Sequence, residues 1–333
     1  MQDQCVATLR EGERVDAVFA LRAKEMRAAR TGEAYLSLEL ADRSGRISGI
    51  MFRPGRDAES VPVGTIVRVR GVVTSYRGVL RIAAETLRPT STYDLRDILP
   101  AGTRDEAEML AALRAHARSV KDVRLRRLLR AVFGDAEFMD RFRSCPASQT
   151  HHHACTGGLL EHTVGVAAMC RSAASWYPHI DADLLVTGAL LHDVGKVDEL
   201  SFGTGIEYTD EGRMLGHVVL GERRVRAAIA SLGDAFPNDL ATRLSHMLLS
   251  HHGELEWGSP KRPCTLEALV LHHVDNLDAK TAGFVEASAS AGMVDEPWTD
   301  AGNLFRRPLY APRAAEDDRW AAPAEDDQYV RSA

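Results

Sequence analysis

Hydrophobic and polar side chains alternate along the first 90 residues, and turn residues separate the alternating runs. At residues 35–40, for example, Leu36, Leu38 and Leu40 fall on one face of the chain. This period of two residues is typical of strands with one buried face, and it predicts five strands, at residues 13–22, 35–40, 46–52, 64–75 and 79–87. Five short strands in succession predict a small closed barrel.

The pattern changes after residue 103, where hydrophobic positions recur at helical spacing. Thr103 is expected to cap the first helix, and from there to about residue 290 the pattern predicts helices alone. Residues 313–333 are acidic and lack periodicity, so a mobile tail is expected there. We therefore predict an α+β protein with a barrel at residues 1–90, a Pro- and Gly-containing linker at 91–103, an all-α bundle at 104–295 and a C-terminal extension at 296–333.

Composition and charge narrow the class of protein. The chain has 45% hydrophobic and 26% charged residues, as globular proteins do, and its net charge of −6 excludes a chain-wide basic surface. Residues 1–90 nevertheless hold 15 Lys and Arg against 11 Asp and Glu. The five dispersed cysteines are expected to be free thiols in a reducing compartment. With no leader and no apolar run of about 18 residues, the sequence predicts a cytoplasmic protein without a membrane partner.

The basic barrel is a candidate surface for single-stranded nucleic acid. Alternation places Arg68, Arg70 and Arg81 on the outside, together with Tyr35, which could stack on a base. The alternative is that the arginines are solvated and Tyr35 packs in the core. The strand order and residues 32–47 resemble the OB-fold of anticodon-binding proteins, which implies a barrel that binds nucleic acid.

Histidine and aspartate residues gather at predicted helix ends in the second half of the chain. His192 and Asp193 are adjacent at the end of the apolar helix 184–191, and Lys196 follows one turn later. The other candidates are His162, His217, His251, His252 and Asp275. A lone histidine is more often a core or capping residue, but a cluster of them is costly unless the imidazoles are paired, hydrated or bound to metal. Helical bundles build metal sites from facing helices, and nitrogen and oxygen donors without thiolate suit Mn²⁺, Fe²⁺, Co²⁺, Ni²⁺ or Zn²⁺ better than Mg²⁺.

These residues carry a family resemblance. The order of His162, His192-Asp193 and Asp275 resembles the signature of the HD superfamily of metal-dependent phosphohydrolases. Residues 152–154, 157–163, 250–260, 271–272 and 275–280 narrow the resemblance to the YhaM-type 3′→5′ exoribonucleases, in which an OB domain also precedes the HD domain. The resemblance extends to about residue 290.

The resemblance implies two divalent ions, expected to be Mn²⁺, with Co²⁺, Fe²⁺, Ni²⁺ or Mg²⁺ as alternatives. The implied ligands of the first ion are His162, His192, Asp193 and Asp275, and those of the second are His217, His251 and the bridging Asp193. His252 is expected to be a further ligand or a substrate contact. Two adjacent ions can activate a water and clamp the reacting phosphate.

Other residues near the predicted site have two interpretations each. Lys196 is expected to contact a substrate phosphate, with a solvated Lys at a helix end as the alternative. His152 and His153 are expected to bind substrate phosphate or to protonate the leaving 3′-oxygen, and the latter would make His153 catalytic beside Asp193. The alternative is a surface loop pair. Trp257 either stacks on a base or packs in the core.

The function that these features predict is a metal-dependent 3′→5′ exonuclease that degrades single-stranded RNA to nucleoside monophosphates. Single-stranded DNA as a second substrate and assembly into a homo-oligomer are left open. The alternatives are an HD phosphohydrolase acting on a nucleotide or cyclic nucleotide, a non-catalytic nucleic-acid-binding protein, and a hydrolase of tRNA-related substrates. Deleting residues 1–90 is expected to leave the activity intact only if the substrate is a small molecule.

Overall fold

The computed structural model describes most of the chain, namely residues 4–28, 33–76, 78–94, 97–98, 104–149, 155–202, 206–233, 236–291, 297–299 and 301–311. The expected acidic tail at residues 313–333 lies outside these ranges. Within them, no helix is both long enough and apolar enough to cross a membrane.

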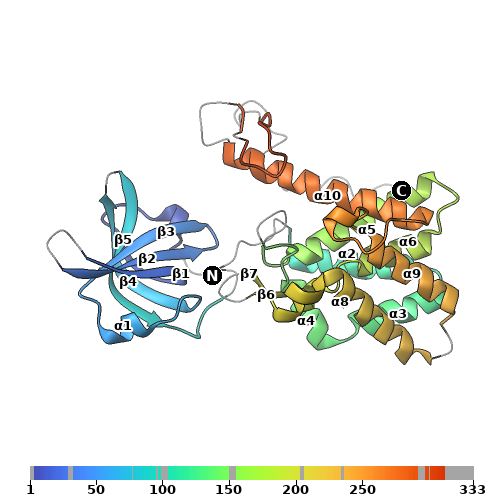
Figure 1. Cartoon of the computed structure of the whole chain (residues 1–333), viewed down its shortest axis with the longest axis horizontal. Helices are drawn as coiled ribbons and strands as arrows, with labels where there is room; N and C mark the ends of the chain where they lie inside the picture. Colours follow the sequence, from blue (N-terminus) through green and yellow to red (C-terminus); the bar gives the residue numbers. More distant parts are fainter. Residues whose placement is uncertain are drawn as a thin grey trace. The chain divides into compact units, whose positions relative to one another are not determined.

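The N-terminal strands close into a barrel, as predicted (Figure 1). The strands are β1 (Arg14–Ala28), β2 (Ala34–Asp42), β3 (Gly45–Phe52), β4 (Ile66–Tyr76) and β5 (Val79–Pro89), and they follow one another around the barrel in the order β1-β2-β3-β5-β4. The neighbours β3 and β5 are parallel and the other pairs are antiparallel. The 3₁₀ turn η1 (Val6–Thr8) precedes β1, and the short helix α1 (Arg56–Ser60) joins β3 to β4.

The inward residues of these strands form a hydrophobic core of their own. Phe19, Leu21, Leu40, Val69 and Ile82 are completely buried in it. The first strand is longer than its pattern predicts, because it continues to Ala28 rather than ending at residue 22. Its second half is mostly exposed, so it carries no clean alternation, and its pairing with β2 holds it in place.

The rest of the first compact unit, which ends at Asp275, is mainly helical. Its helices are α2 (Glu106–Ser119), α3 (Val123–Phe133), α4 (Ala136–Ser144), α5 (Gly158–Trp176), α6 (Ala182–Leu191), α7 (Lys196–Glu199), α8 (Asp210–Ser231), α9 (Asn238–Ser250) and the first part of α10 (Leu266–Ala291), with the 3₁₀ turn η4 (Leu255–Trp257). All of these helices except α7 are labelled in Figure 1. Residues 184–191 of α6 are all buried, because this helix is apolar on every side.

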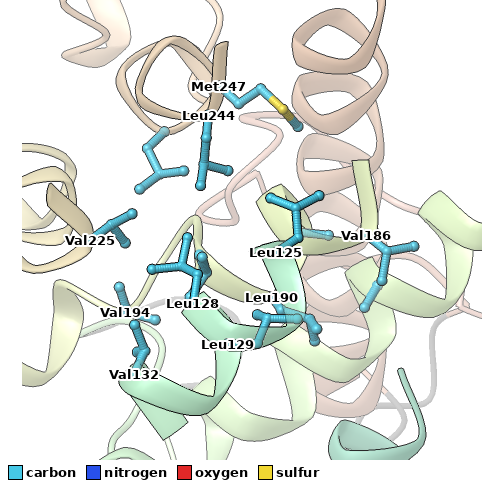
Figure 2. Packing of buried hydrophobic residues seen from close by; sticks show 14 of the residues in the cluster. Leu125, Leu128, Leu129, Val132, Val186, Leu190, Val194, Val225, Leu244 and Met247 are labelled. Atoms are coloured by element: carbon cyan, nitrogen blue, oxygen red, sulfur yellow. The ribbon is translucent and has the colours of Figure 1, made fainter. Parts of the chain in front are cut away.

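Helix α6 is therefore surrounded by the other helices. Figure 2 shows its Val186 and Leu190 with Leu125 and Leu128 of α3, and Met247 of α9 belongs to the same cluster. This packing fixes the C-terminal end of α6, where the His-Asp pair lies.

The prediction of helices alone between residues 104 and 290 was wrong at one place. A two-stranded antiparallel hairpin, β6 (Leu200–Phe202) and β7 (Ile206–Tyr208), lies between α7 and α8. Strands of three residues are too short to produce a recognisable alternation, so the sequence pattern did not reveal them.

Aspartate side chains cap four helices of the bundle. Asp105 caps α2 by accepting a hydrogen bond from the backbone N–H of Glu108. The predicted start at Thr103 was therefore two residues early, and Thr103 itself lies outside the described residues. Asp122, Asp135 and Asp181 cap α3, α4 and α6 in the same way.

Replacing Asp122 with Ala is expected to lower the free energy of unfolding by about 1 kcal/mol. The Asp122 carboxylate accepts hydrogen bonds from the backbone N–H groups of Arg124 and Leu125. Its hydrogen bond with the Arg124 guanidinium lowers the pKa of Asp122 to about 2. Because the folded-state pKa lies below the unfolded value, this stabilisation is present above about pH 4 and is lost as the pH falls toward 2.

Urea unfolding followed by far-UV circular dichroism measures the loss. Asp122→Asn is the matched control because Asn is as good a helix cap. An Asp122→Ala protein as stable as the parent at neutral pH would contradict the capping role.

The described residues from Asn276 onward belong to a second compact unit. Within it, Phe284 packs against Phe305, with ring centroids 5.8 Å apart, and Trp298 pairs with Tyr310 through an isolated β-bridge. The described residues 297–299 and 301–311 of the predicted C-terminal extension thus contain local order.

Candidate metal centre

The fold brings together all six predicted metal ligands from five separate parts of the chain. His162 comes from the second turn of α5, and His192 and Asp193 directly follow α6. The other three are His217 inside α8, His251 directly after α9 and Asp275 in the third turn of α10. Each of the four histidines is at most 9% exposed, and Asp193 is 2% exposed.

Asp193 divides the histidines into two clusters. Its Oδ2 atom lies 3.4 Å from the Nε2 atoms of both His162 and His192. Its Oδ1 atom lies 3.4 Å from Nε2 of His217 and 3.6 Å from Nε2 of His251. One carboxylate therefore offers one oxygen to each cluster.

The first cluster contains His162, His192, Asp193 and Asp275. The Nε2 atoms of His162 and His192 are 3.1 Å apart, and Oδ1 of Asp275 lies 3.2 Å from Nε2 of His162. The second cluster contains Asp193, His217, His251 and His252, and it includes the predicted extra residue, because Nε2 of His252 lies 3.2 Å from Nε2 of His217.

The same backbone device orients His192 and His251. Each residue follows the last turn of its helix, and its Nδ1–H donates to the carbonyl oxygen three residues earlier, at 2.7 Å in both cases. These carbonyls belong to the last helical turn, whose oxygens lack helical partners. With Nδ1 committed as a donor, the neutral ring directs the lone pair of Nε2 into the site.

His217 is placed by a break in α8. Gly216 has φ 73° and ψ 156°, a conformation that interrupts the helix and that residues with a side chain rarely adopt. The His217 ring then donates from Nδ1 to Glu199 at 3.0 Å. His252 likewise donates from Nδ1 to the carbonyl oxygen of Trp257 at 2.9 Å.

The second cluster has the electronic arrangement of a cation site. Because Nδ1 of each ring donates a hydrogen bond elsewhere, His217 and His252 face each other through Nε2 atoms that are only 3.2 Å apart. Burial, followed by the nearby His251 and His217, lowers the pKa of His252 to about 3, so its ring is neutral near pH 7. Two facing lone pairs repel each other unless a cation lies close to both.

Two buried atoms of the site also lack a hydrogen-bond partner, namely Asp193 Oδ1 and His251 Nε2. Such orphaned groups are costly unless something binds them. Both atoms face the second cluster. The donor set of imidazole nitrogens and carboxylate oxygens therefore fits a divalent transition metal at this position.

Charge keeps the carboxylates of the site ionised. Burial alone would raise the pKa of Asp193, but the Lys196 ammonium, 2.6 Å from Oδ2, and the neighbouring imidazoles hold it well below the usual range. Burial likewise opposes ionisation of Asp275, and its hydrogen bond with His162 outweighs that effect and lowers its pKa. Metal binding requires deprotonated carboxylates, so both residues are ready to bind.

Comparison with known proteins identifies the family. The model of the HD domain matches residues 159–280, and the model of the OB-fold nucleic acid binding domain matches residues 18–90. The 3′-5′ exoribonuclease YhaM of Bacillus subtilis (strain 168) is 35% identical over 275 residues, which cover 81% of this chain and 86% of that protein. The chain belongs to the YhaM family of 3′-5′ exoribonucleases. The YhaM protein of Listeria monocytogenes serotype 4b is 32% identical over 272 residues, which cover 80% of this chain and 86% of that protein.

Membership of the YhaM family accounts for the order of the two domains. All six predicted ligands fall inside the HD match, and the predicted barrel strands from residue 18 onward fall inside the OB match. The HD domain makes this chain a metal-dependent hydrolase, and its His and Asp cluster could hold the metal.

One residue of this YhaM-family site escaped the sequence prediction. Glu199, at the end of α7, accepts hydrogen bonds from both the backbone N–H and the ring Nδ1–H of His217, at 2.9 and 3.0 Å. It lies 18 residues before His217, in a segment of ordinary polar composition. Its role depends on the packing of α7 against α8. The local sequence pattern does not predict this packing.

Lys196 lies inside the site rather than on a solvated helix end. Its side chain is 12% exposed, and its Nζ pairs with Asp193 Oδ2 at 2.6 Å. The alternative of a solvated Lys was therefore wrong. The other predicted phosphate contacts, His152 and His153, lie outside the described residues.

The four predicted nucleic-acid contacts of the barrel do not form one surface. Arg68 and Arg70 of β4 both pair with Asp16 of β1, at 2.6 and 3.0 Å. Tyr35 lies on β2, which is not a neighbour of β4 in the barrel, and its ring is 5.7 Å from that of Phe52. Arg81 lies on β5, with its guanidinium 4.7 Å from the centre of the Tyr76 ring.

Proposed function

We propose that this chain degrades single-stranded RNA from its 3′ end to nucleoside monophosphates, using two divalent ions in the HD domain. The observation that carries the proposal is the position of Asp193, which directs one carboxylate oxygen to each histidine cluster. Ligands that share one bridging carboxylate are typical of two-metal phosphodiester hydrolysis. The ions would activate a water for attack on phosphorus and stabilise the charge that develops on the phosphate.

His162, His192, Asp193 and Asp275 would hold the first ion, and Asp193, His217, His251 and His252 the second. We propose Mn²⁺ at both positions, because mixed imidazole and carboxylate ligands suit Mn²⁺ and its heavier neighbours better than Mg²⁺. Lys196 would reach the substrate phosphate from beside Asp193, and His152 and His153 would contact the same phosphate or the leaving 3′-oxygen.

The barrel would hold the strand. Tyr35 packs against Phe52, which is 51% exposed, so this pair offers aromatic surface to bases. Arg81 would contribute positive charge from β5, the strand that pairs with β3. Arg68 and Arg70 would act as a second basic site, at which a phosphate competes with Asp16 for the guanidinium groups.

The test supplies the purified chain with Mn²⁺ and a 5′-labelled single-stranded RNA, with the matching DNA as a second substrate. We expect a ladder of products that shortens from the 3′ end and releases monophosphates. Rapid turnover of a mononucleotide or cyclic nucleotide, with both strands left intact, would instead show a small-molecule phosphohydrolase. Strand binding without any hydrolysis would show a non-catalytic protein.

Replacing Glu199 with Ala is expected to lower the affinity for the second ion by about 10- to 100-fold, because partners that orient a metal-binding histidine have effects of this size. The first ion should bind as before. Titration with Mn²⁺ by calorimetry measures both affinities. Glu207→Ala, an exposed substitution on β7, is the matched control. Equal affinities in the two variants would contradict the orienting role of Glu199.

Two further proposals concern context. All five cysteines are free thiols, and we place the protein in the cytoplasm, where thiols stay reduced. A homo-oligomer would let one subunit's barrel present the strand to another subunit's HD domain, and sedimentation of the full chain tests this.

A further inference from the structure

Trp257 lies in the loop that follows the second cluster. The sequence leaves two roles open for this side chain, stacking on a base or packing in the core. Trp257 is 52% exposed, so it is not a core residue. Packing in the core therefore does not explain why an exposed tryptophan lies close to the second cluster.

The loop holds Trp257 in a defined place. Its backbone N–H donates to the carbonyl oxygen of Glu254 at 3.1 Å, and its own carbonyl accepts from His252 Nδ1 at 2.9 Å. Ser259, which is 3% exposed, continues the turn by donating its backbone N–H to Glu254. The loop is therefore anchored on both sides of the indole.

The same contacts join Trp257 to the metal ligands. Nε2 of His252 belongs to the second cluster, while Nδ1 of the same ring holds the Trp257 carbonyl. The ring of His272 lies 6.0 Å from the indole, and His272 Nδ1 donates to the carbonyl oxygen of His251. The Trp257 backbone therefore bonds directly to a member of the second cluster.

The surroundings suit a nucleic-acid strand. Lys261 and Arg262 are exposed a few residues farther along the same loop, and Arg262 pairs with Glu254 at 3.1 Å. Leu255 in the same turn is 55% exposed. Aromatic side chains beside basic ones are the usual means of holding single strands, because bases stack on the ring and phosphates meet the positive charge.

We infer that Trp257 is a stacking platform for a nucleobase next to the bond that is cut. The inference rests on the proposed function and deepens it. A phosphate bound at the two clusters brings an adjoining base within reach of the indole, because consecutive nucleotides share that phosphate. The platform therefore sets the affinity for the 3′ end of the strand, while the clusters set the chemistry.

The test compares Trp257→Ala and Trp257→Phe with the parent on 5′-labelled single-stranded RNA. Loss of one base-stacking contact is expected to raise KM about tenfold or more in Trp257→Ala, with kcat changed less than about threefold. Trp257→Phe should recover most of the affinity. The matched control is Trp176→Ala, because Trp176 is 81% exposed and lies on α5 about 21 Å along the helix axis from His162.

A second arm removes the base instead of the ring. RNA strands with an abasic residue at the last or the penultimate position are offered to the parent and to Trp257→Ala. At one of these positions the abasic substitution should raise KM for the parent and erase the difference between the two proteins. The inference would be overturned if Trp257→Ala raised KM relative to the parent by the same factor on the abasic strands as on the intact strand.

The outcomes separate the two proposals. If the parent degrades the intact strand but Trp257→Ala behaves like Trp176→Ala, the platform fails and the proposed function stands. If the parent does not degrade RNA at all, both fail together. A change in oligomeric state on sedimentation, without an abasic-dependent change in KM, would show that Trp257 contacts a second copy of the chain and would also overturn the inference.

Discussion

Replacing Asp193 with Asn is expected to reduce RNA hydrolysis by about a thousandfold or more and to remove metal from both clusters. Asp193 faces the first cluster through Oδ2 and the second through Oδ1, so a neutral amide weakens both positions at once. Metal ions contribute several kcal/mol of transition-state stabilisation, and each 1.36 kcal/mol corresponds to about tenfold in rate. Kinetics with RNA and the metal content after dialysis measure the two effects.

Asp275→Asn is the informative partner variant. Asp275 lies beside the first cluster only, at 3.2 Å from His162 Nε2, so this variant should lose one ion and keep the other. Asp198→Asn, in a carboxylate that pairs with Arg224 at 2.7 Å, controls for loss of a nearby negative charge. RNA binding should stay within a few-fold of the parent in all three variants. Full activity in Asp193→Asn would remove the basis for a two-metal site.

The Asn substitution also leaves Lys196 without its carboxylate partner. Removing one member of a buried ion pair costs about 3–5 kcal/mol. Thermal unfolding therefore has to accompany the kinetics. If the Asp193→Asn protein stays folded and loses only its metal and its activity, Asp193 acts in the metal site rather than in the stability of the core.

The barrel strands and the central helix could be predicted because they depend on the local pattern of hydrophobic and polar residues. Alternating residues such as Leu36, Leu38 and Leu40 are buried in β2, and the uniformly apolar α6 is the central helix. His192 and His251 could be found because each directly follows a helix, where a polar side chain is otherwise unexpected inside a bundle. His252 was also correctly suspected to lie at the site, although its carbonyl partner at Trp257 was not evident.

The remainder depends on contacts between distant segments. Alternation correctly placed Arg68 and Arg70 outside the barrel, but it carried no information about Asp16 on the neighbouring strand. Glu199 escaped for the same reason, since its hydrogen bonds to His217 exist only once α7 and α8 are packed together. The sequence shows which residues are charged, but it does not show which oppositely charged residue each one will contact in the fold.

Replacing Gly195 with Ala is expected to lower kcat/KM for RNA by about two orders of magnitude. Gly195 has φ −69° and ψ −17°, which Ala adopts without strain, so the effect comes from space alone. An added Cβ would lie 2.1 Å from the carbonyl oxygen of His217 and 2.4 Å from the backbone nitrogen of Gly221. Both contacts are to backbone, so α8 must move, and His217 moves with it.

Displacements of about 1 Å in a catalytic site cost roughly a hundredfold in rate, and overpacking costs about 1–3 kcal/mol of stability. Gly221→Ala tests the same contact from the other helix. Its Cβ would lie 3.2 Å from the Gly195 nitrogen, which a small shift relieves, and Ala is about 1 kcal/mol better than Gly inside a helix. Gly221→Ala should therefore keep nearly full activity and stability. If Gly195→Ala matched it in kcat/KM and in unfolding temperature, the close contact of α7 with α8 would not be what positions His217.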